Sequence, residues 1–208
     1  MKFENLFPAS IYCINIKSRT DRWNSATIEF EKINIKPERF DAIENKKNPV
    51  AGCRESHLAI LKEAKKKNEN VFIFEDDVEF IDNTNIILDN AISELSELDW
   101  AMFYMGGNIL KPFYQVSEHL AKLSHCQSAH AYGINKKYLS QIINIVERNN
   151  TFIDVIYADG IIPYVNAFIT VPMIAIQKSG YSNIENKIMT YEIPIARYNH
   201  FLVRKNEK

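Results

Sequence analysis

Residues 71–78 have the sequence Val71-Phe72-Ile73-Phe74-Glu75-Asp76-Asp77-Val78, an apolar run that ends in three consecutive carboxylates. Four apolar β-forming residues after a segment rich in lysine and asparagine predict a strand that is buried on both faces. The acids therefore stand at the carboxyl end of the strand, where open α/β sheets place their ligand crevice. Adjacent carboxylates repel one another unless water or a cation compensates them, so a divalent cation is the simplest explanation.

Successive side chains of an extended chain point to opposite sides, so Glu75 and Asp77 are expected on one side and Asp76 on the other. We therefore expect Glu75 and Asp77 to supply the metal-facing oxygens. The alternative is a solvated junction between strand and loop, and an isolated acidic triplet favours neither interpretation. The rest of the chain has to decide between them.

Length and composition predict one domain. The 208 residues are 46% hydrophobic and 12% aromatic, which is enough to bury one full core, with two lobes as an open alternative. The net charge of -1 argues against an extended contact with a phosphate backbone, because nucleic-acid binders carry a basic excess. We expect no nucleic-acid partner.

Cysteine usage and hydropathy bear on the compartment. Cys13, Cys53 and Cys126 are far apart and show no CxxC spacing, so neither a disulfide framework nor a structural zinc site is predicted. A reducing cytoplasm fits best. No window of about 18 apolar residues predicts a transmembrane segment, and the start of the chain lacks a signal-peptide pattern. A peripheral contact at the inner face of the membrane stays open.

Strand-like and helix-like segments alternate along the chain, which predicts an α/β fold. The expected elements are strands at 10–16, 38–43, 71–74 and 100–105, helices at 18–34, 53–67, 84–98 and from 135, an extended run at 126–134, and a late strand at 168–176. Pro172 interrupts the late strand, which indicates an edge or a bend. Two alternatives stand for the tail from 183: it folds over the crevice or remains mobile.

The turn after the first strand brings Asn15, Arg19 and Arg22 near the expected crevice. Guanidinium groups there can bind a nucleotide phosphate or base. The alternative is that the arginines pair with Asp21 or Glu29 on a solvated face.

Ser56 and His57 fall in the first turns of the helix predicted at 53–67. Exposed backbone N–H groups at a helix start favour anions. For His57, satisfied packing is the alternative.

Asp154 and Asp159 are isolated carboxylates in the otherwise apolar stretch 151–162. Burying a carboxylate is costly unless it is paired or functional, so both are site candidates. The alternative for either is a plain helix cap.

Seven segments occur in an order that resembles glycosyltransferase family 25, which contains bacterial lipooligosaccharide galactosyltransferases and is related to collagen galactosyltransferase domains. They are Ile14-Asn15-Ile16 followed by Arg22, Phe40-Asp41-Ala42, Gly52-Cys53-Arg54-Glu55-Ser56-His57-Leu58, Phe74-Glu75-Asp76-Asp77-Val78, Tyr132, Phe152-Ile153-Asp154 and 172–177. The resemblance covers roughly 11–182. It departs at 128–132, where Ser128-Ala129-His130-Ala131-Tyr132 replaces a small Gly-Thr-Ala segment, and this bears on the acceptor.

The resemblance implies a GT-A-like fold, a mixed and mainly parallel sheet flanked by helices, in a single domain with a donor-binding lobe at about 10–110, an acceptor-side lobe at about 111–182 and a tail at 183–208. It implies inverting transfer of a hexose, galactose before glucose, from a UDP-sugar to a saccharide hydroxyl in lipopolysaccharide or another surface glycan.

The resemblance also implies roles for individual residues. Mn²⁺ or Mg²⁺ is expected at Glu75 and Asp77. Asp154 is expected to be the general base, with Asp159 as the other candidate. The expected donor-binding residues are Asn15, Arg19, Arg22, Ser56, His57 and Asp76, and the expected acceptor-side residues are His130, Tyr132 and Gln177.

Two rival functions stand beside this one. A metal-dependent phosphoesterase could use the acidic triplet, although it would be expected to offer more histidine and aspartate ligands. A catalytically silent module could bind a sugar or nucleotide without turnover.

Overall fold

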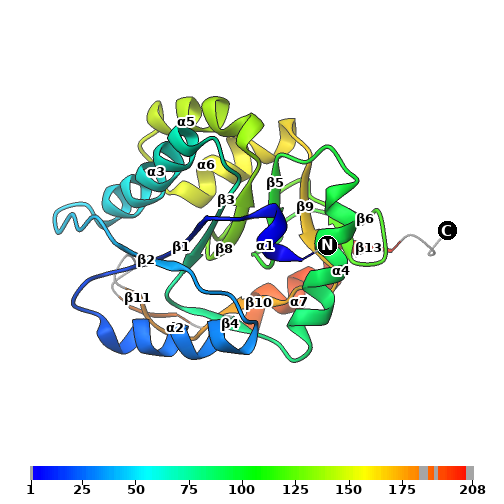
Figure 1. Cartoon of the computed structure of the whole chain (residues 1–208), viewed down its shortest axis with the longest axis horizontal. Helices are drawn as coiled ribbons and strands as arrows, with labels where there is room; N and C mark the ends of the chain where they lie inside the picture. The colour runs from blue at the N-terminus through cyan, green and yellow to red at the C-terminus, as the bar shows by residue number, and fades with distance from the viewer. Residues whose placement is uncertain (1, 183–186, 190–191, 205–208) are drawn as a thin grey trace.

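The computed structural model describes residues 2–182, 187–189 and 192–204, which form one large mixed sheet with helices on both faces (Figure 1). Nine strands lie in the order β13-β6-β7-β9-β5-β8-β3-β1-β2. Seven run in one direction, and only β7 and β8 of these nine run against them. The strands are β1 (Ser10–Asn15), β2 (Glu38–Asp41), β3 (Val71–Glu75), β5 (Met102–Tyr104), β6 (Phe113–Gln115), β7 (Leu120–Lys122), β8 (Ala131–Ile134), β9 (Ala167–Thr170) and β13 (Leu202–Val203). The predicted α/β class, with a mixed and mainly parallel sheet flanked by helices, is confirmed.

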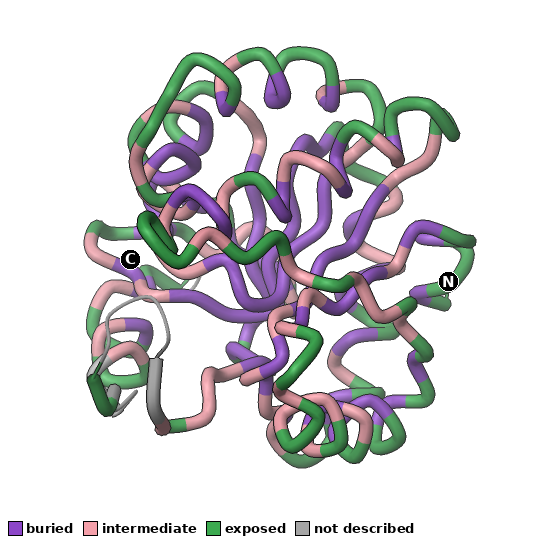
Figure 2. The backbone as a smooth tube through the Cα atoms, turned by 90° about the vertical axis from the view of Figure 1, so that its left-hand side faces the viewer, coloured by how far each residue is buried: buried purple, intermediate pink, exposed green. Residues whose placement is uncertain are grey.

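Helices cover both faces of the sheet. One core contains α3 (Pro49–Lys67), α5 (Leu139–Glu147) and α6 (Ile153–Gly160), and the other contains α1 (Phe3–Leu6), α2 (Thr20–Lys32) and α4 (Thr84–Ser96). Figure 1 shows α3, α5 and α6 together on one side of the sheet. Figure 2 shows the strands buried at the centre and the outer faces of the helices exposed.

The apolar run of β3 follows from this layering. Val71 and Ile73 belong to the core under α3, whereas Phe72 and Phe74 belong to the core under α2 and α4. All four side chains are fully buried. A strand covered on both sides needs apolar residues at every position, because successive side chains point to opposite faces.

The described residues also form two short two-stranded ribbons and two 3-10 helices. They are β4 (Val78–Phe80) with β10 (Ala175–Gln177), β11 (Gly180–Ser182) with β12 (Lys187–Met189), η1 (Lys136–Tyr138) and η2 (Ile162–Tyr164). The chain that enters β10 crosses close to the end of β5, where Met105 O accepts from the backbone N of Ile174 (2.9 Å) and Ala175 (3.1 Å). A Cβ on Gly106 would lie 1.7 Å from Ala175 O, so only glycine permits this approach.

Several predicted boundaries are corrected. The helix expected at 53–67 begins four residues earlier, because Asn48 Oδ1 accepts from Ala51 N and Pro49 occupies the first turn. Gly52 therefore lies inside the helix. The helix expected from Ser18 begins at Thr20. The interruption at Pro172 is confirmed, since β9 ends at Thr170 and β10 begins at Ala175.

The described parts of the tail pack on the sheet. α7 (Glu192–Phe201) places Tyr198 against β9, where its hydroxyl donates to Thr170 O. Leu202 reaches the core, and β13 pairs in parallel with β6. For 183–186, 190–191 and 205–208, the alternatives stated above lie outside the described residues. The division into donor and acceptor lobes stays a prediction. Among the described residues, no helix is both long and apolar enough to cross a bilayer.

Candidate active site

The acidic triplet, Glu75 with Asp76 and Asp77, lies at the carboxyl edge of β1 and β3. Asn15 ends β1 beside it. The reversed strand β8 begins at this edge, so His130 O accepts from Glu75 N at 2.9 Å. Asp76 and Asp77 form a turn between β3 and β4. The alternation of an extended strand therefore stops at Glu75 and does not separate Asp76 from Asp77.

Arg22 of α2 joins Asp76 and Asp77. Its two terminal nitrogens lie 2.8 Å from Asp76 Oδ1 and 3.2 Å from Asp77 Oδ2. Asp76 also accepts a hydrogen bond from Asn15 Nδ2, and both side chains are buried. Burial raises the pKa of Asp76, against the opposing effects of Arg22 and Asn15. Arg22 thus points into the site, and the solvated-face alternative does not apply to it.

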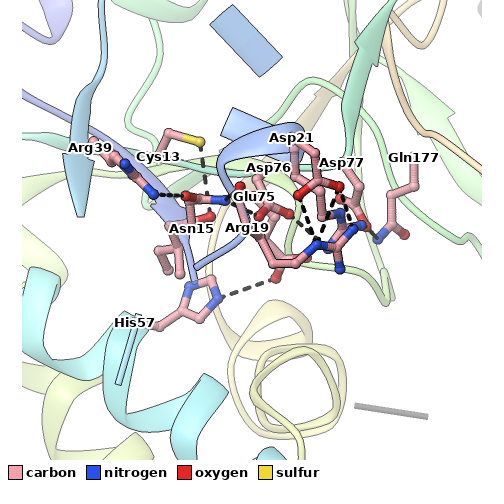
Figure 3. Close-up of polar contacts among 12 residues, drawn as sticks. Cys13, Asn15, Arg19, Asp21, Arg39, His57, Glu75, Asp76, Asp77 and Gln177 are labelled. Carbon is pink, nitrogen blue, oxygen red and sulfur yellow. Dashed lines mark hydrogen bonds and ion pairs between the residues drawn. The ribbon is translucent and has the colours of Figure 1, made fainter. Parts of the chain in front are cut away.

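Arg19 behaves differently. Its guanidinium contacts the exposed carboxylate of Asp21 through Nε at 3.0 Å and a terminal nitrogen at 2.9 Å (Figure 3). The backbone carbonyl of Arg19 accepts from Asn15 Nδ2 at 3.1 Å. The alternative of pairing with Asp21 is therefore confirmed for Arg19, although the residue borders the site.

Asp77 has a carboxylate oxygen that lacks a partner. Oδ1 is buried and forms no hydrogen bond with any described residue, whereas Oδ2 accepts from Gln177 Nε2 at 3.4 Å. Burial raises the pKa of Asp77 to about 7, Glu75 and Asp76 add to the rise, and Arg22 opposes it. An orphaned carboxylate oxygen beside a second carboxylate is the kind of donor set that a hard divalent cation completes. The donor chemistry of Glu75 and Asp77 suits such a cation, and their expected role as ligands of Mn²⁺ or Mg²⁺ stays a prediction.

Glu75 contacts the first of a series of buried, hydrogen-bonded side chains, which are His57, Tyr132 and Tyr157. Its Oε1 lies 3.3 Å from His57 Nε2 (Figure 3), and His57 Nδ1 hydrogen-bonds the hydroxyl of Tyr132 at 2.8 Å. That hydroxyl lies 3.0 Å from the hydroxyl of Tyr157. Burial acts to raise the pKa of Glu75, but the hydrogen bond and charge of His57 outweigh it and the pKa is lowered. His57 thus favours the ionised form of Glu75.

Ser56, which was expected to bind the donor, and Tyr132, which was expected on the acceptor side, both contact other protein groups. Because α3 begins at Pro49, Ser56 lies about two turns inside it, away from free N–H groups. The Ser56 hydroxyl accepts from Ile43 N and donates to Gly52 O, both at 2.8 Å. The anion-binding rationale for Ser56 and His57 is therefore wrong. Tyr132 is fully buried, and its hydroxyl contacts protein groups.

Cys53 was not among the expected site residues. Its Sγ, a ring nitrogen of His57 and a carboxylate oxygen of Glu75 all lie within 4.8 Å of one another. Burial, followed by the charges of Glu75, Asp154 and Asp77, raises the pKa of the thiol well above its usual range. The spacing of Cys53 and His57, four residues apart on one helix, is the signal that could have identified the pair.

Asp154 and Asp159 occupy different surroundings. Asp154 accepts from Ser128 N at 3.1 Å and from Val155 N at 2.8 Å. Burial raises the pKa of Asp154, and the nearby charge of Glu75 acts in the same direction. Asp159 has 66% of its side chain exposed and lies 3.5 Å from His125 Nε2. The expectation that burial makes Asp159 a site candidate is wrong, because its stretch is a helix with one exposed face.

His130 and Gln177 line a small pocket. Ser128, Gly107 and Pro194 also border it. His130 is buried, its Nε2 lies 3.3 Å from Ala175 O, and its Nδ1 has no partner among the described residues. Two of its lining residues contact candidate site acids: Gln177 contacts Asp77, and Ser128 contacts Asp154.

A wider cavity of about 550 Å³ lies near the opposite edge of the sheet. Its lining includes Tyr114, Tyr138 and Tyr164, together with the residues that precede β9. None of its lining residues is acidic. This cavity is therefore distinct from the acidic site.

Comparison with known proteins gives one family match. Residues 49–153 match glycosyltransferase family 25 (LPS biosynthesis protein). Among curated proteins, none matches the chain significantly.

Among the solved structures that align with this chain are the following three. A197 from STIV aligns with 86% of this chain and 92% of its own at 11% identity and a TM-score of 0.49. A glycosyltransferase involved in the glycosylation of the major capsid of PBCV-1 aligns over 92% and 98% at 10% identity and a TM-score of 0.45. UDP-glucose pyrophosphorylase complexed with UDP-glucose aligns over 92% and 80% at 10% identity and a TM-score of 0.43.

The family match spans half of the chain and includes α3, β3 and the whole acidic triplet. It ends one residue before Asp154. A sequence match of this extent over the segments that build the site settles the family. The chain belongs to glycosyltransferase family 25 and is a glycosyltransferase.

Proposed function

We propose that this enzyme transfers a hexose from a UDP-sugar to a saccharide hydroxyl with inversion. Galactose is our first choice of sugar and glucose the second, and the product belongs to lipopolysaccharide or another surface glycan. The observation that carries the proposal is the buried Oδ1 of Asp77, which has no partner among the described residues and stands at the carboxyl edge of the sheet, next to Glu75 and Arg22.

Glu75 and Asp77 would hold Mn²⁺ or Mg²⁺ in this proposal. A divalent cation there supplies positive charge that offsets the charge developing on the departing UDP. Arg22 adds a second positive charge at the same edge, fixed by Asp76. His57 keeps Glu75 ionised and oriented through their 3.3 Å contact.

On the acceptor side, Asp154 is the proposed general base. The acceptor oxygen attacks the anomeric carbon from the side opposite UDP, and the carboxylate of Asp154 takes the hydroxyl proton. The new carbon–oxygen bond forms as the bond to the diphosphate breaks, and its electron pair leaves with UDP. Two backbone N–H groups fix the Asp154 carboxylate, so it is oriented before the acceptor binds. His130 and Gln177 would line the path between donor and acceptor.

We also propose that the enzyme works in the cytoplasm. All three cysteines are unpaired, which fits a reducing compartment.

The first test is a panel of UDP-sugars screened by thermal shift with and without Mn²⁺, because a bound donor raises stability by mass action. We expect the correct donor to raise Tm only with the cation, and EDTA to remove the shift. The variant Asp77→Asn should lose the cation-dependent shift, whereas Asp89→Asn, an exposed acid on α4, should keep it. Equal UDP binding by Asp77→Asn and wild type, with or without Mn²⁺, would remove Asp77 from the metal site.

Turnover measurements then distinguish the proposed transferase from a phosphoesterase and from a binding module. UDP release should require an added saccharide acceptor. Release at the same rate without an acceptor favours a phosphoesterase, and donor binding without transfer across a broad acceptor panel favours a binding module.

A further inference from the structure

Cys53, His57 and Glu75 form a second set of metal-ligand atoms beside the carboxylates discussed above. Cys53 and His57 are four residues apart on α3, so their side chains share one face of the helix. That face meets the end of β3, where Glu75 stands. One sulfur, one nitrogen and one oxygen atom are thereby brought within 4.8 Å of one another.

The imidazole of His57 is held in a ligand-like orientation. Tyr132 hydrogen-bonds Nδ1 at 2.8 Å, and this leaves Nε2 directed at Glu75 Oε1 (Figure 3). Histidines that bind metals usually engage an oxygen through their other ring nitrogen, because that contact fixes the tautomer and the ring. Tyr157 hydrogen-bonds Tyr132 in turn, so the support extends one group further into the core.

The chemistry of the three atoms selects a different class of cation from the one proposed for Glu75 and Asp77. Oxygen-only sites suit Mn²⁺ and Mg²⁺, whereas a set of thiolate, imidazole and carboxylate suits Zn²⁺ or Co²⁺. Three protein ligands leave a fourth tetrahedral position open. A thiolate and a carboxylate also balance the two positive charges of the ion. The cysteine spacing predicted no structural zinc site, and the mixed set of Cys53, His57 and Glu75 departs from that prediction because it uses a single cysteine.

We propose that Cys53, His57 and Glu75 bind a thiophilic divalent cation of the Zn²⁺ class. Binding forms a bond between the metal and Cys53 Sγ and releases the thiol proton to solvent. The site shares Glu75 with the proposed Mn²⁺ or Mg²⁺ position, so the two ions exclude each other from that carboxylate. On the proposed function, which this part of the inference rests on, Zn²⁺ inhibits transfer in competition with Mn²⁺.

Cobalt gives a readout that does not depend on activity. Metal-stripped full-length protein titrated with Co²⁺ should develop a near-ultraviolet thiolate-to-cobalt charge-transfer band, and Zn²⁺ should remove it by displacement. Cys53→Ser should lack the band, whereas Cys126→Ala, which changes a cysteine outside the set, should keep it. A band retained in folded Cys53→Ser, or absent in wild type at saturating Co²⁺, overturns the proposal.

A second measurement uses only the wild-type chain and so does not depend on how the variants fold. The rate at which Cys53 is alkylated is followed by peptide mass spectrometry. At a Zn²⁺ concentration about ten times Kd, alkylation should slow roughly tenfold, because only the metal-free fraction reacts. An unchanged rate at saturating Zn²⁺ counts against the site.

Inhibition is then measured against each protein's own rate with Mn²⁺ alone. Zn²⁺ inhibition that fades as Mn²⁺ rises in wild type, and is lost in Cys53→Ser, supports the shared carboxylate. If the cobalt band is present but no donor or acceptor supports turnover, the metal site stands and the proposed function fails. If turnover depends on Mn²⁺ but no band forms, the proposed function stands and the metal site fails.

Discussion

Asp154 and Asp159 are five positions apart on α6, about 140° around the helix axis at 3.6 residues per turn. This rotation directs one carboxylate toward the N–H of Ser128 and the charge of Glu75, and the other toward solvent and His125. At the scale of single residues, exposure thus separates two acids that look equivalent in the sequence. A base needs both a raised pKa and access to the acceptor; Asp154 is partly buried, which raises its pKa, whereas the side chain of Asp159 is exposed.

The substitution Asp154→Asn should lower kcat by about 10²–10⁴-fold, because it preserves size and removes basicity. Donor affinity, measured by calorimetry with UDP-sugar and Mn²⁺, should stay near that of wild type. Asp159→Asn is the matched control and should leave kcat within a few-fold of normal. If the two variants exchange these behaviours, the assignments must be exchanged, and if neither lowers kcat, His130 is the next residue to test.

The raised pKa of Asp77 predicts how stability depends on pH in metal-free protein. In the folded state the pKa is about 7, against 3.8 for an ordinary aspartate, so the folded form binds the proton more tightly. Between these values, the stability contributed by the proton is lost as pH rises. The free energy of unfolding of Asp77→Asn, relative to wild type, should therefore increase from about pH 4 to about pH 7. Urea denaturation with EDTA at a series of pH values measures this difference, and a flat difference across that range would contradict the assignment.

At the scale of elements, α3 is positioned by a glycine. A Cβ on Gly52 would lie 2.5 Å from Ile43 O and 2.9 Å from Asn45 N, and both of these are backbone atoms that cannot easily move. The same helix carries Cys53 and His57, so its distance from the loop at 43–45 also sets their approach to Glu75.

Gly52→Ala should destabilise the protein by about 1–3 kcal/mol through overpacking. The usual effect of this change inside a helix is the opposite, a gain of about 0.5–1 kcal/mol. Gly160→Ala, also in a helix, is the control, since its added Cβ would meet only Ile145 Cγ2 at 3.7 Å. Chemical denaturation of both variants gives the sign of the change in the free energy of unfolding. A gain of stability in Gly52→Ala would show that α3 has room to shift.

The order of helices and strands was predictable because hydrophobic period and turn residues are local signals. The early start of α3 was also predictable in principle, since Asn48-Pro49 is a cap followed by a favoured first-turn proline. The turn at Asp76 and Asp77 was not, because it depends on β4 pairing with β10 about a hundred residues later. The same long-range pairing brings Gln177 to Asp77, which no local pattern in the sequence indicates.

At the scale of the whole molecule, the C-terminal elements belong to the fold. Tyr198 of α7 is 3% exposed, packs on Phe113 with ring centroids 5.0 Å apart, and donates to Thr170 O. β13 extends the sheet beyond β6 and therefore shields an edge that would otherwise offer unpaired backbone groups.

Tyr198→Ala should therefore destabilise the protein by about 3–5 kcal/mol, the range for large buried side chains. Tyr164→Ala is the control, because that ring is 77% exposed and its loss should change stability by no more than about 0.5 kcal/mol. Thermal and urea unfolding of the two variants provide the comparison. Similar stabilities would mean that α7 packs only loosely on the sheet.

The reversed direction of β8 has a consequence for how this enzyme can diversify. Because β8 runs against β3 and β5, the segment that leads into it, rather than one that follows it, arrives at the carboxyl edge of the sheet. Ser128 and His130 enter the site on that segment, while Glu75 and Asn15 enter at the ends of their own strands. These residues thus come from different segments of the chain. On the proposed function, changes of length or sequence at 124–130 can alter the acceptor side of the site without changing the strands that carry Asn15 and Glu75.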